Sequence, residues 1–365
     1  MRILLNASTI VHGGGIQVAI NIIETFVEES NLELCIISSL NLYEALEPKT
    51  KKHVKVIESS PAKLLSFRSR NKILSIADNF NPDIIYSVGA PSYINFKQKE
   101  VLRLTNPYII GIRDSYLINS SFYKKYFIWL KTYVQRLFIS KNHFIITQTD
   151  LAKEMIQENL KVPPNKIKVI SNSLTKYAVK TQKNILEKNV ILTLGYPYPH
   201  KNVRIIPDVA YHLKKLGAKD FKFIITLGEK NSERKLFEKK MIQQNVVDMI
   251  EIIDSIPHTK INEFYSRGNI VFLPSICEIF SATIIEAMFH EKSILAADED
   301  FNKSLFKNDI HYFESTNPRD AAEKLIKLFE REKETPNYTS YYNFFNQKGN
   351  YREHLNALID FYNSN

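Results

Sequence analysis

The sequence predicts an α/β protein built from two Rossmann-like domains. Both halves of the 365-residue chain alternate short apolar runs with helical patterns, as consecutive βαβ units and a parallel sheet do. The chain is also longer than one hydrophobic core usually serves. A polar, basic stretch with weak periodicity, residues 174–189, separates the two series. We therefore expect one domain over residues 1–175 and a second over residues 176–337.

The N-terminal half contains short apolar runs that are typical of buried parallel strands. We expect strands at 3–6, 34–38, 54–57, 84–87, 109–112 and 144–147, and helices at about 63–79, 122–141 and 150–159. A glycine-rich loop follows the first strand and leads into an amphipathic helix. Gly14 and Gly15 stand there at the carboxyl edge of the sheet, where glycines let a phosphate or sugar approach the backbone. A flexible connector is the alternative interpretation.

The C-terminal half repeats the alternation of strands and helices. We expect strands at 190–194, 221–227, 249–253, 270–273 and 293–297, with helices at about 203–216, 231–244, 259–267 and 282–289. Lys201 lies at the carboxyl end of the first of these strands, just before a helix. A cation in that place is well situated to meet a diphosphate. Taken alone, a lysine in this place is more often an ordinary surface residue.

Residues 269–297 form the most informative stretch, a strand, loop, helix and strand. Glu278 lies in the loop, and Glu286 lies eight positions later in the helix. The free N–H groups at the helix start, near Ser281, Ala282 and Thr283, make an anion site at the positive end of the helix dipole. Glu286 could accept hydrogen bonds from a ribose diol and Glu278 from a sugar. The alternative is that both acids are simply solvated.

The segment 278–288, EIFSATIIEAM, resembles the E-x7-E segment of retaining GT-B glycosyltransferases of the family 4 (glycosyl transferases group 1) type. Phe280, Glu286, Ala287 and Met288 match the family pattern, and Ser281 stands where glycine is usual. The resemblance implies a GT-B fold, in which two Rossmann-like domains face each other across a cleft. It also implies that the C-terminal helix, within residues 338–365, crosses back to the N-terminal domain.

A second loop, residues 195–202, resembles the G-R-x-x-P-x-K loop of the same family. Gly195, Pro199 and Lys201 match, whereas Tyr196 replaces the arginine, so that Lys201 must hold more of the donor diphosphate. The resemblance implies that Lys201 and Glu278 are the catalytic residues. It further places Gly14, Gly15, Phe280, Ser281, Ala282, Thr283 and Glu286 on the donor, and Ile256 near its nucleobase.

Arg113 and Asp114 follow the strand expected at 109–112, in a region where family members contact the acceptor. We interpret them as acceptor-side residues, with a surface Arg–Asp pair as the alternative. The resemblance implies a UDP- or GDP-sugar donor, no cofactor and no metal ion. The predicted reaction is therefore transfer of a sugar, with retention, from a nucleotide-diphosphate donor to a glycan acceptor.

Residues 122–141 combine aromatic and aliphatic side chains with five lysines and arginines and no acid. A helix with a basic face and an aromatic face can lie at an anionic membrane surface. A core helix with solvated lysines is the alternative. The net charge of +10 does not by itself choose among nucleic acid, membrane and phosphorylated substrates. No recognised nucleic-acid motif accompanies it, so we expect no nucleic-acid partner.

Composition and termini bear on the compartment. Cys35 and Cys277 are the two cysteines and show no metal-type spacing. No apolar run approaches the length of a membrane span, and the N-terminal apolar segment is too short for a signal peptide. We expect a cytoplasmic enzyme, peripheral on the inner face of the membrane. The resemblance implies that its acceptor is lipid-linked, in bacterial O-antigen or capsule synthesis. The main alternative is a non-catalytic sugar- or membrane-binding module with a degenerate site. An epimerase or phosphorylase of the same fold is a weaker one.

Overall fold

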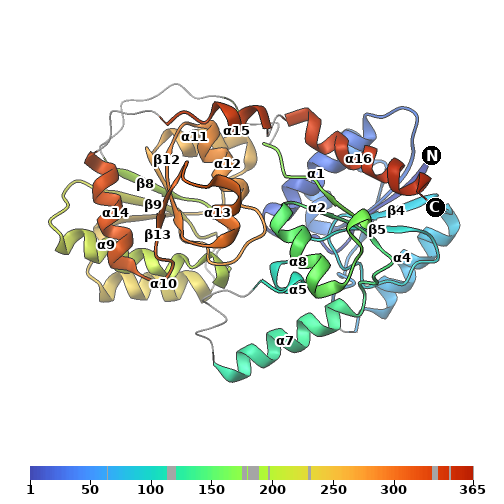
Figure 1. The fold of residues 1–365 in the computed structure, drawn as a ribbon, viewed down its shortest axis with the longest axis horizontal. Coiled ribbons are helices and arrows are strands. Elements are labelled where there is room, and N and C mark those ends of the chain that lie inside the picture. Colours follow the sequence, from blue (N-terminus) through green and yellow to red (C-terminus); the bar gives the residue numbers. More distant parts are fainter. Residues whose placement is uncertain are drawn as a thin grey trace. The chain divides into compact units, whose positions relative to one another are not determined.

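The computed structural model of the chain describes residues 1–63, 65–112, 121–174, 179, 189–195, 198–228, 232–330, 336–344 and 347–364. Its chain divides into two compact units (Figure 1). Unit 1 holds the described residues of Met1–Ile112, Ser120–Ser173 and Gln347–Asn365, and unit 2 holds those of Leu174–Asn346. The unit boundaries thus fall after residues 173 and 346, where the sequence suggests residues 175 and 337.

Unit 1 is built on a parallel sheet of seven strands in the order β3-β2-β1-β4-β5-β6-β7. The strands are β1 Arg2–Ala7, β2 Glu33–Ser39, β3 Val54–Ile57, β4 Ile84–Ser87, β5 Glu100–Arg103, β6 Phe144–Thr147 and β7 Ile167–Val169. The helices are α1 Gly14–Val27, α2 Leu40–Ala45, α3 Pro48–Lys51, α4 Phe67–Phe80, α5 Pro107–Ile110, α7 Phe122–Arg136, α8 Asp150–Leu160, the short η1 Pro164–Lys166 and the C-terminal α16 Gln347–Asn363.

Both faces of the unit 1 sheet are covered. One face packs against α1 and α16, and the other packs against α4. Side chains of β1 enter both layers, since Ile3 and Leu5 lie in the first and Leu4 lies in the second. This alternation explains why the strand is an unbroken apolar run. The C-terminal helix α16 joins unit 1 through its aromatic and aliphatic face, which contributes Tyr351, Leu355, Leu358 and Phe361 to the α1 layer.

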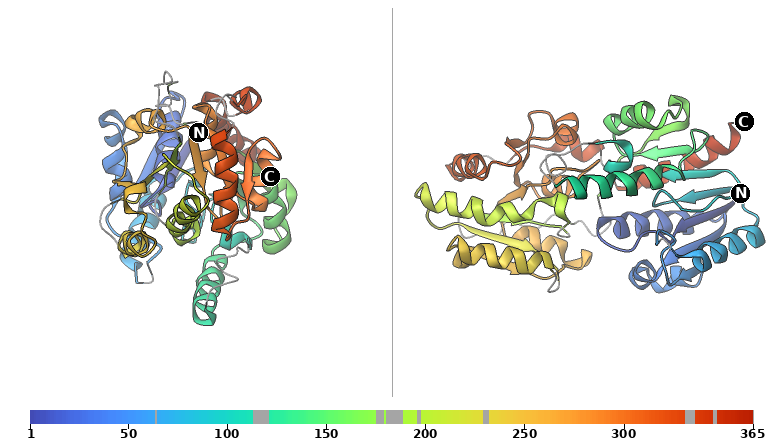
Figure 2. Two further views of the ribbon diagram at one scale, coloured as in Figure 1. Left: turned by 90° about the vertical axis from the view of Figure 1, so that its left-hand side faces the viewer. Right: turned by 90° about the horizontal axis from the view of Figure 1, so that it is seen from below.

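Unit 2 contains a parallel sheet of six strands in the order β10-β9-β8-β11-β12-β13. The strands are β8 Val190–Thr193, β9 Lys222–Thr226, β10 Ile250–Ile253, β11 Ile270–Leu273, β12 Ser293–Ala297 and β13 His311–Phe313. The helices are η2 Pro199–Lys201, η3 Val203–Ile205, α9 Ile206–Lys215, α10 Ser232–Gln243, η4 Val247–Met249, η5 His258–Lys260, α11 Ile261–Ser266, α12 Ala282–Phe289, α13 Asp300–Phe306, α14 Pro318–Glu330 and α15 Thr339–Phe344. Helices cover both faces of this sheet too (Figure 2).

The strand orders confirm the predicted fold class. Each sheet runs outward from its first strand in one direction and then restarts on the other side, the 3-2-1-4-5-6 order of a Rossmann fold. The order reverses between β1 and β4 in unit 1 and between β8 and β11 in unit 2. Open α/β sheets bind their ligands outside the strand ends at such a reversal. We therefore expect the ligand site of unit 2 at the loops that follow β8 and β11.

Three expectations for unit 1 are wrong in detail. Residues 109–112 are not a strand, because Asn106 caps a helix and Pro107 opens it, which starts α5. The missed strand is β5, whose charged ends, Glu100 and Arg103, conceal it in the sequence. The helix expected over 122–141 ends at Arg136. The glycine-rich segment is also not a loop throughout, since α1 begins at Gly14.

Within the described residues, no helix has the length and apolar character needed to cross a membrane. The same residues contain no group of three or more His, Cys, Asp and Glu side chains placed to hold a metal ion.

Candidate functional site

The loops after β8 and β11 meet at the strand-order reversal of unit 2. Lys201, at the end of η2, and Glu278, between β11 and α12, form an ion pair with 2.7 Å between Nζ and Oε1. Their side chains are 21% and 10% exposed, so the pair is largely shielded from water. A backbone hydrogen bond of 2.9 Å from the Ile276 N–H to the His200 carbonyl ties the two loops together. The fold thus brings together two residues that sequence reasoning assigned to one site.

The start of α12 lies at the end of the same loop. Ser281 is the N-cap residue and is almost fully buried at 3% exposed, yet its side chain makes no cap hydrogen bond. Its Oγ has no hydrogen-bond partner in the part of the chain that the structure describes. A buried hydroxyl without a partner is costly unless a ligand or water completes it. Ala282 is exposed and Thr283 is half-buried, so the first turn of the helix is open to a ligand.

Glu286 lies one turn into α12 and is partly buried. The Tyr265 hydroxyl, from α11, donates a 3.0 Å hydrogen bond to Glu286 Oε2. Burial raises the pKa of Glu286 to about 7, although the Tyr265 hydrogen bond and the positive charge of Lys201 both act to lower it. A carboxyl group with a strongly shifted pKa in a strand-end loop region is a functional-site candidate in its own right.

Two further residues shape this site. Gly195 has a φ of 147°, in the range that side chains rarely adopt, and its N–H donates to Thr226 Oγ1 at 3.0 Å. A Cβ added to Gly195 would lie 4.0 Å from Cε of Lys201, which is an ordinary contact, so the backbone conformation and not the lysine favours glycine here. Phe280 is 7% exposed and packs in the hydrophobic core, where it holds the loop in place. Tyr196 lies outside the described residues.

The remaining predicted site residues lie in another loop of unit 2, in unit 1 or outside the described residues. Ile256 is half-buried against the core of unit 2, in the loop after β10. Gly14 and Gly15 belong to unit 1, where they form the first turn of α1. A Cβ on Gly14 would meet no other atom within 4 Å. There is space for a ligand beside this residue, but the structure does not require glycine at this position. Arg113 and Asp114 lie outside the described residues.

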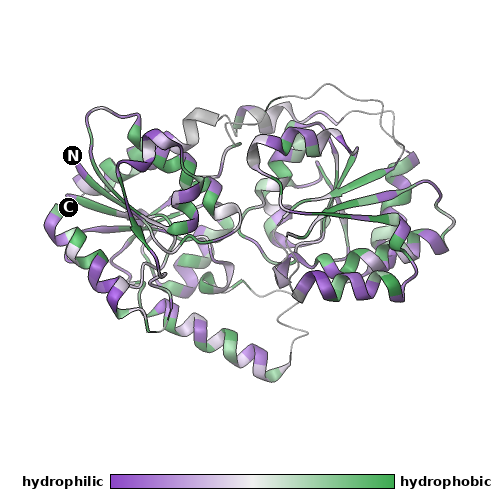
Figure 3. Cartoon of the chain, turned by 180° about the vertical axis from the view of Figure 1, so that it is seen from behind, coloured by the Kyte–Doolittle hydropathy of each residue, from purple (hydrophilic) through white to green (hydrophobic). Residues whose placement is uncertain are grey.

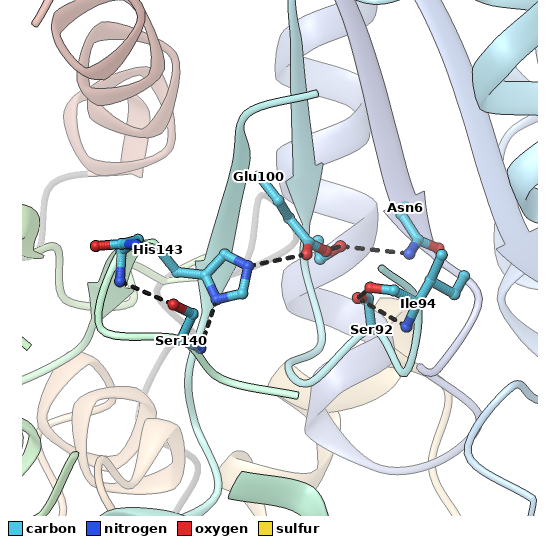
Figure 4. A network of polar contacts seen from close by, with 8 residues as sticks. Asn6, Ser92, Ile94, Glu100, Ser140 and His143 are labelled. Atoms are coloured by element: carbon cyan, nitrogen blue, oxygen red, sulfur yellow. Dashed lines mark hydrogen bonds and ion pairs between the residues drawn. The ribbon is translucent and has the colours of Figure 1, made fainter. Parts of the chain in front are cut away.

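Unit 1 contains a buried polar network of its own (Figure 4). Ser87 Oγ donates to Glu100 Oε1 at 2.5 Å, and Asn6 Nδ2 donates to Ser87 Oγ at 3.3 Å. His143 Nε2 lies 3.6 Å from Glu100 Oε2. Burial raises the pKa of Glu100 to about 7 and lowers that of His143. Both oxygens of the acid have protein partners, so this network stabilises β4, β5 and β6 and offers a ligand little.

Sequence reasoning missed Tyr265. It lies in a short helix, and its neighbours Phe264 and Ile261 are also core residues. An aromatic residue in such a helix is expected to pack, and no feature of the sequence separates it from the others. Its relation to Glu286 exists only because α11 and α12 cover the same face of the sheet.

Comparisons with known proteins agree with this geometry. Residues 177–344 match the family model Glycosyl transferases group 1. The matched region includes the loops that carry Lys201 and Glu278 and the helix α12 that carries Glu286. No curated protein matches the chain. Among solved structures, a glycosyltransferase from Rickettsia africae ESF-5 is similar, with 17% identity and a TM-score of 0.75 over 100% of this chain and 99% of the other.

Two further solved structures extend the comparison. Anabaena Alr3699/HepE in complex with UDP and glucose is 15% identical, with a TM-score of 0.78 over 99% of this chain and 100% of the other. WaaG, a glycosyltransferase involved in lipopolysaccharide biosynthesis, is 12% identical, with a TM-score of 0.69 over 98% and 95%. At these identities the likeness establishes the fold. The chain therefore has the GT-B fold of two Rossmann-like domains, and its residues 177–344 carry the sequence pattern of glycosyl transferases group 1.

Proposed function

We propose that this protein is a glycosyltransferase that moves a sugar from a nucleotide-diphosphate donor to a glycan acceptor, with retention and without a metal ion. The observation that carries the proposal is the Lys201–Glu278 pair beside the open N-terminus of α12, at the strand-order reversal of unit 2. The family match over residues 177–344 and the UDP bound to the HepE relative support a nucleotide sugar as donor.

The roles follow from charge. Breaking the glycosidic bond leaves a diphosphate with growing negative charge, and preorganised donors that face it stabilise the transition state. The Lys201 ammonium and the first-turn N–H groups of α12 are such donors. Glu278 is close enough to Lys201 to accept hydrogen bonds from the sugar beside the diphosphate, and Glu286 accepts those of the ribose diol. Since the resemblance implies retention, the acceptor attacks on the face that the diphosphate leaves and gives its proton to the leaving phosphate.

The test is release of nucleoside diphosphate from UDP-, GDP- and CDP-sugars in the absence of an acceptor. We expect slow hydrolysis of one donor class by the wild-type protein and its loss in Lys201→Ala. Lys222→Ala is the matched control, because Lys222 forms a similar ion pair of 2.8 Å with Glu251 but lies at the start of β9, the opposite end of the strands. Binding without hydrolysis, even when glycan acceptors are added, would instead support the non-catalytic module.

We further propose that the acceptor is lipid-linked and that the enzyme works at the cytoplasmic face of a membrane. The support comes from α7, which extends away from the rest of unit 1 (Figure 1). Of its residues, Gln135 alone is buried. The exposed large side chains of this segment are Phe122, Tyr123, Tyr126, Phe127, Trp129, Leu130, Tyr133, Val134 and Leu137. Within the described residues, α7 is therefore not packed as a core helix, which supports the proposal.

Hydrophobic and hydrophilic residues alternate along α7 (Figure 3). Trp129 stacks between Tyr126 and Tyr133, with ring centroids 5.9 and 5.7 Å apart. The helix also carries Lys124, Lys125, Lys131 and Arg136 and no acid. Aromatic rings suit the headgroup boundary, and the cations suit anionic lipid. An anionic membrane surface matches both properties of the helix.

A further inference from the structure

Tyr265 connects α11 to the carboxylate of Glu286 in a fixed geometry. Its side chain is 0% exposed. The hydroxyl lies 3.0 Å from Glu286 Oε2 and 3.5 Å from the Thr283 carbonyl oxygen. The ring stacks on His290, with centroids 4.7 Å apart and planes 15° apart. Because packing holds the ring on all sides, the hydroxyl cannot turn away from the carboxylate.

We propose that Tyr265 is a positioning residue, whose hydroxyl holds Oε2 of Glu286 so that Oε1 stays available to accept hydrogen bonds from a ligand diol. This inference rests on the proposed function. Among the described residues, Tyr265 is the hydrogen-bond donor to this carboxylate, and none donates to Oε1. A ribose presents two adjacent hydroxyl donors, so it needs an acceptor that is both oriented and ionised.

The same hydrogen bond favours the ionised form of Glu286. Burial favours the neutral acid and brings its pKa to about 7, while the Tyr265 O–H donor opposes this shift. If the donor is removed, the neutral acid becomes more stable and the pKa rises further. At neutral pH the protein would then have to give up a proton before the carboxylate could accept from both hydroxyls. Tyr265 therefore affects affinity more at pH 7 than at alkaline pH.

The groups around Glu286 allow this effect to be isolated. Lys201 faces it from η2, with Glu278 paired to that lysine. His290 is the C-cap residue that follows α12. Burial lowers its pKa to about 4, so its side chain stays neutral above pH 7. On α15, Tyr341 donates to Asp309, and its pKa is raised. The pKa of Tyr265 itself is raised well above 10 by its burial. Of the groups whose pKa is shifted here, Glu286 is the one whose pKa lies near 7.

The experiment is calorimetric titration with UDP, GDP and CDP at pH 7, 8 and 9, continued with the diphosphate that binds the wild-type protein. The charge of the diphosphate itself changes little over this range, since a terminal phosphate has its second pKa near 6. Tyr265→Phe keeps the ring and removes the hydroxyl. If this raises the pKa of Glu286 by about one unit, affinity falls about fivefold at pH 7 and by less than about 20% at pH 9.

Tyr338→Phe is the matched control. Tyr338 is buried in the same core, and its hydroxyl donates to the Lys292 carbonyl at 3.3 Å. We expect this variant to bind with wild-type affinity at each pH. Glu286→Gln, which cannot ionise, should bind more weakly and show no change of affinity between pH 7 and 9. This second measurement tests the charge argument even where Tyr265→Phe folds poorly.

The outcomes separate the two proposals. An equal loss at pH 7 and pH 9 in Tyr265→Phe, or no loss at all, overturns the positioning role while the nucleotide site stands. A wild-type affinity that does not rise with pH, or a Glu286→Gln variant that still responds to pH, also overturns it. A wild-type protein that binds none of the three diphosphates overturns the proposed function and with it this inference.

Discussion

Lys201 Nζ lies 2.7 Å from Glu278 Oε1, although the two residues are 77 positions apart in the chain. They meet because β8 and β11, whose loops carry them, are neighbours in the parallel sheet. The contact is a consequence of the strand order, which crosses from one side of the first strand to the other. Under the proposed function, it joins the cation for the diphosphate to the acceptor for sugar hydroxyls.

Removing the lysine tests its catalytic role. Lys201→Ala should lose about 2–4 kcal/mol of transition-state stabilisation, the scale of one preorganised electrostatic donor. The measurement is kcat/KM with the cognate donor, beside Lys222→Ala as the control. Near-normal turnover of the Lys201 variant would show that this lysine does not act on the diphosphate.

The two acids should differ in what they bind. Glu286→Ala is expected to weaken binding of the free nucleoside diphosphate as well as of the sugar nucleotide, because both ligands contain the ribose. Glu278→Ala should instead weaken binding of the intact sugar nucleotide more than that of the diphosphate. Calorimetry with both ligands checks this. Equal losses in the two variants would contradict the separate roles.

Membrane attachment through α7 should depend on its charge. Each Lys or Arg near an anionic surface contributes about 1 kcal/mol, and salt screens the attraction. We expect co-sedimentation with anionic vesicles that falls with added salt and is lost when Lys124, Lys125 and Lys131 become Glu. Uncharged vesicles should bind the wild-type protein weakly.

The matched control changes the same amount of charge elsewhere. Lys49, Lys51 and Lys52 lie in or beside α3, away from α7. Their replacement by Glu alters net charge equally and should leave vesicle binding largely intact. If both triple variants lose binding to the same degree, total charge and not α7 is responsible. Self-association of the wild-type protein without vesicle binding would make α7 a protein contact.

Glu100 should make stability depend on pH. Its folded-state pKa of about 7 lies above the ordinary value of 4.5, so the folded state binds the proton more tightly than the unfolded chain does. The stabilisation is full below 4.5 and is lost as pH rises through about 7. From pH 5 to pH 8 the wild-type protein should therefore lose up to about 3 kcal/mol relative to Glu100→Gln.

Urea unfolding at the two pH values measures this difference. Glu33→Gln is the control, because Glu33 has an exposed side chain, paired with Arg2 at the start of the sheet. It should show no such change relative to the wild-type protein. The contradicting result is a difference in unfolding free energy between wild type and Glu100→Gln that is the same at both pH values. That result would mean that ionisation of Glu100 does not destabilise the folded protein.

Much of the fold could be predicted because buried parallel strands are continuous apolar runs. β3, β4, β6, β11 and β12 lie where these runs predict them. β5 could not be found in this way, since the Ser87 and Asn172 side chains that satisfy Glu100 and Arg103 come from distant parts of the chain. Asn106 and Pro107 are typical of a helix start, whereas the apolar run that follows them is typical of a buried strand.

The residues of the candidate site likewise differ in whether the sequence alone predicts them. Glu278, Ser281 and Glu286 share one local segment, so their grouping could be read from spacing, and resemblance then suggested Lys201. Tyr265 carries no local signal, because its role depends on the packing of α11 beside α12. The exposure of α7 was equally beyond the sequence, since its aromatic residues are also what a core helix would contain.

The most direct test of the nucleotide site is a crystal structure of the protein with its cognate nucleoside diphosphate. We expect the diphosphate within hydrogen-bond distance of Lys201 Nζ and of the N–H groups at Ala282 and Thr283, with the ribose diol on Glu286. A diphosphate bound elsewhere, with the Lys201–Glu278 pair and the start of α12 untouched, would contradict the account.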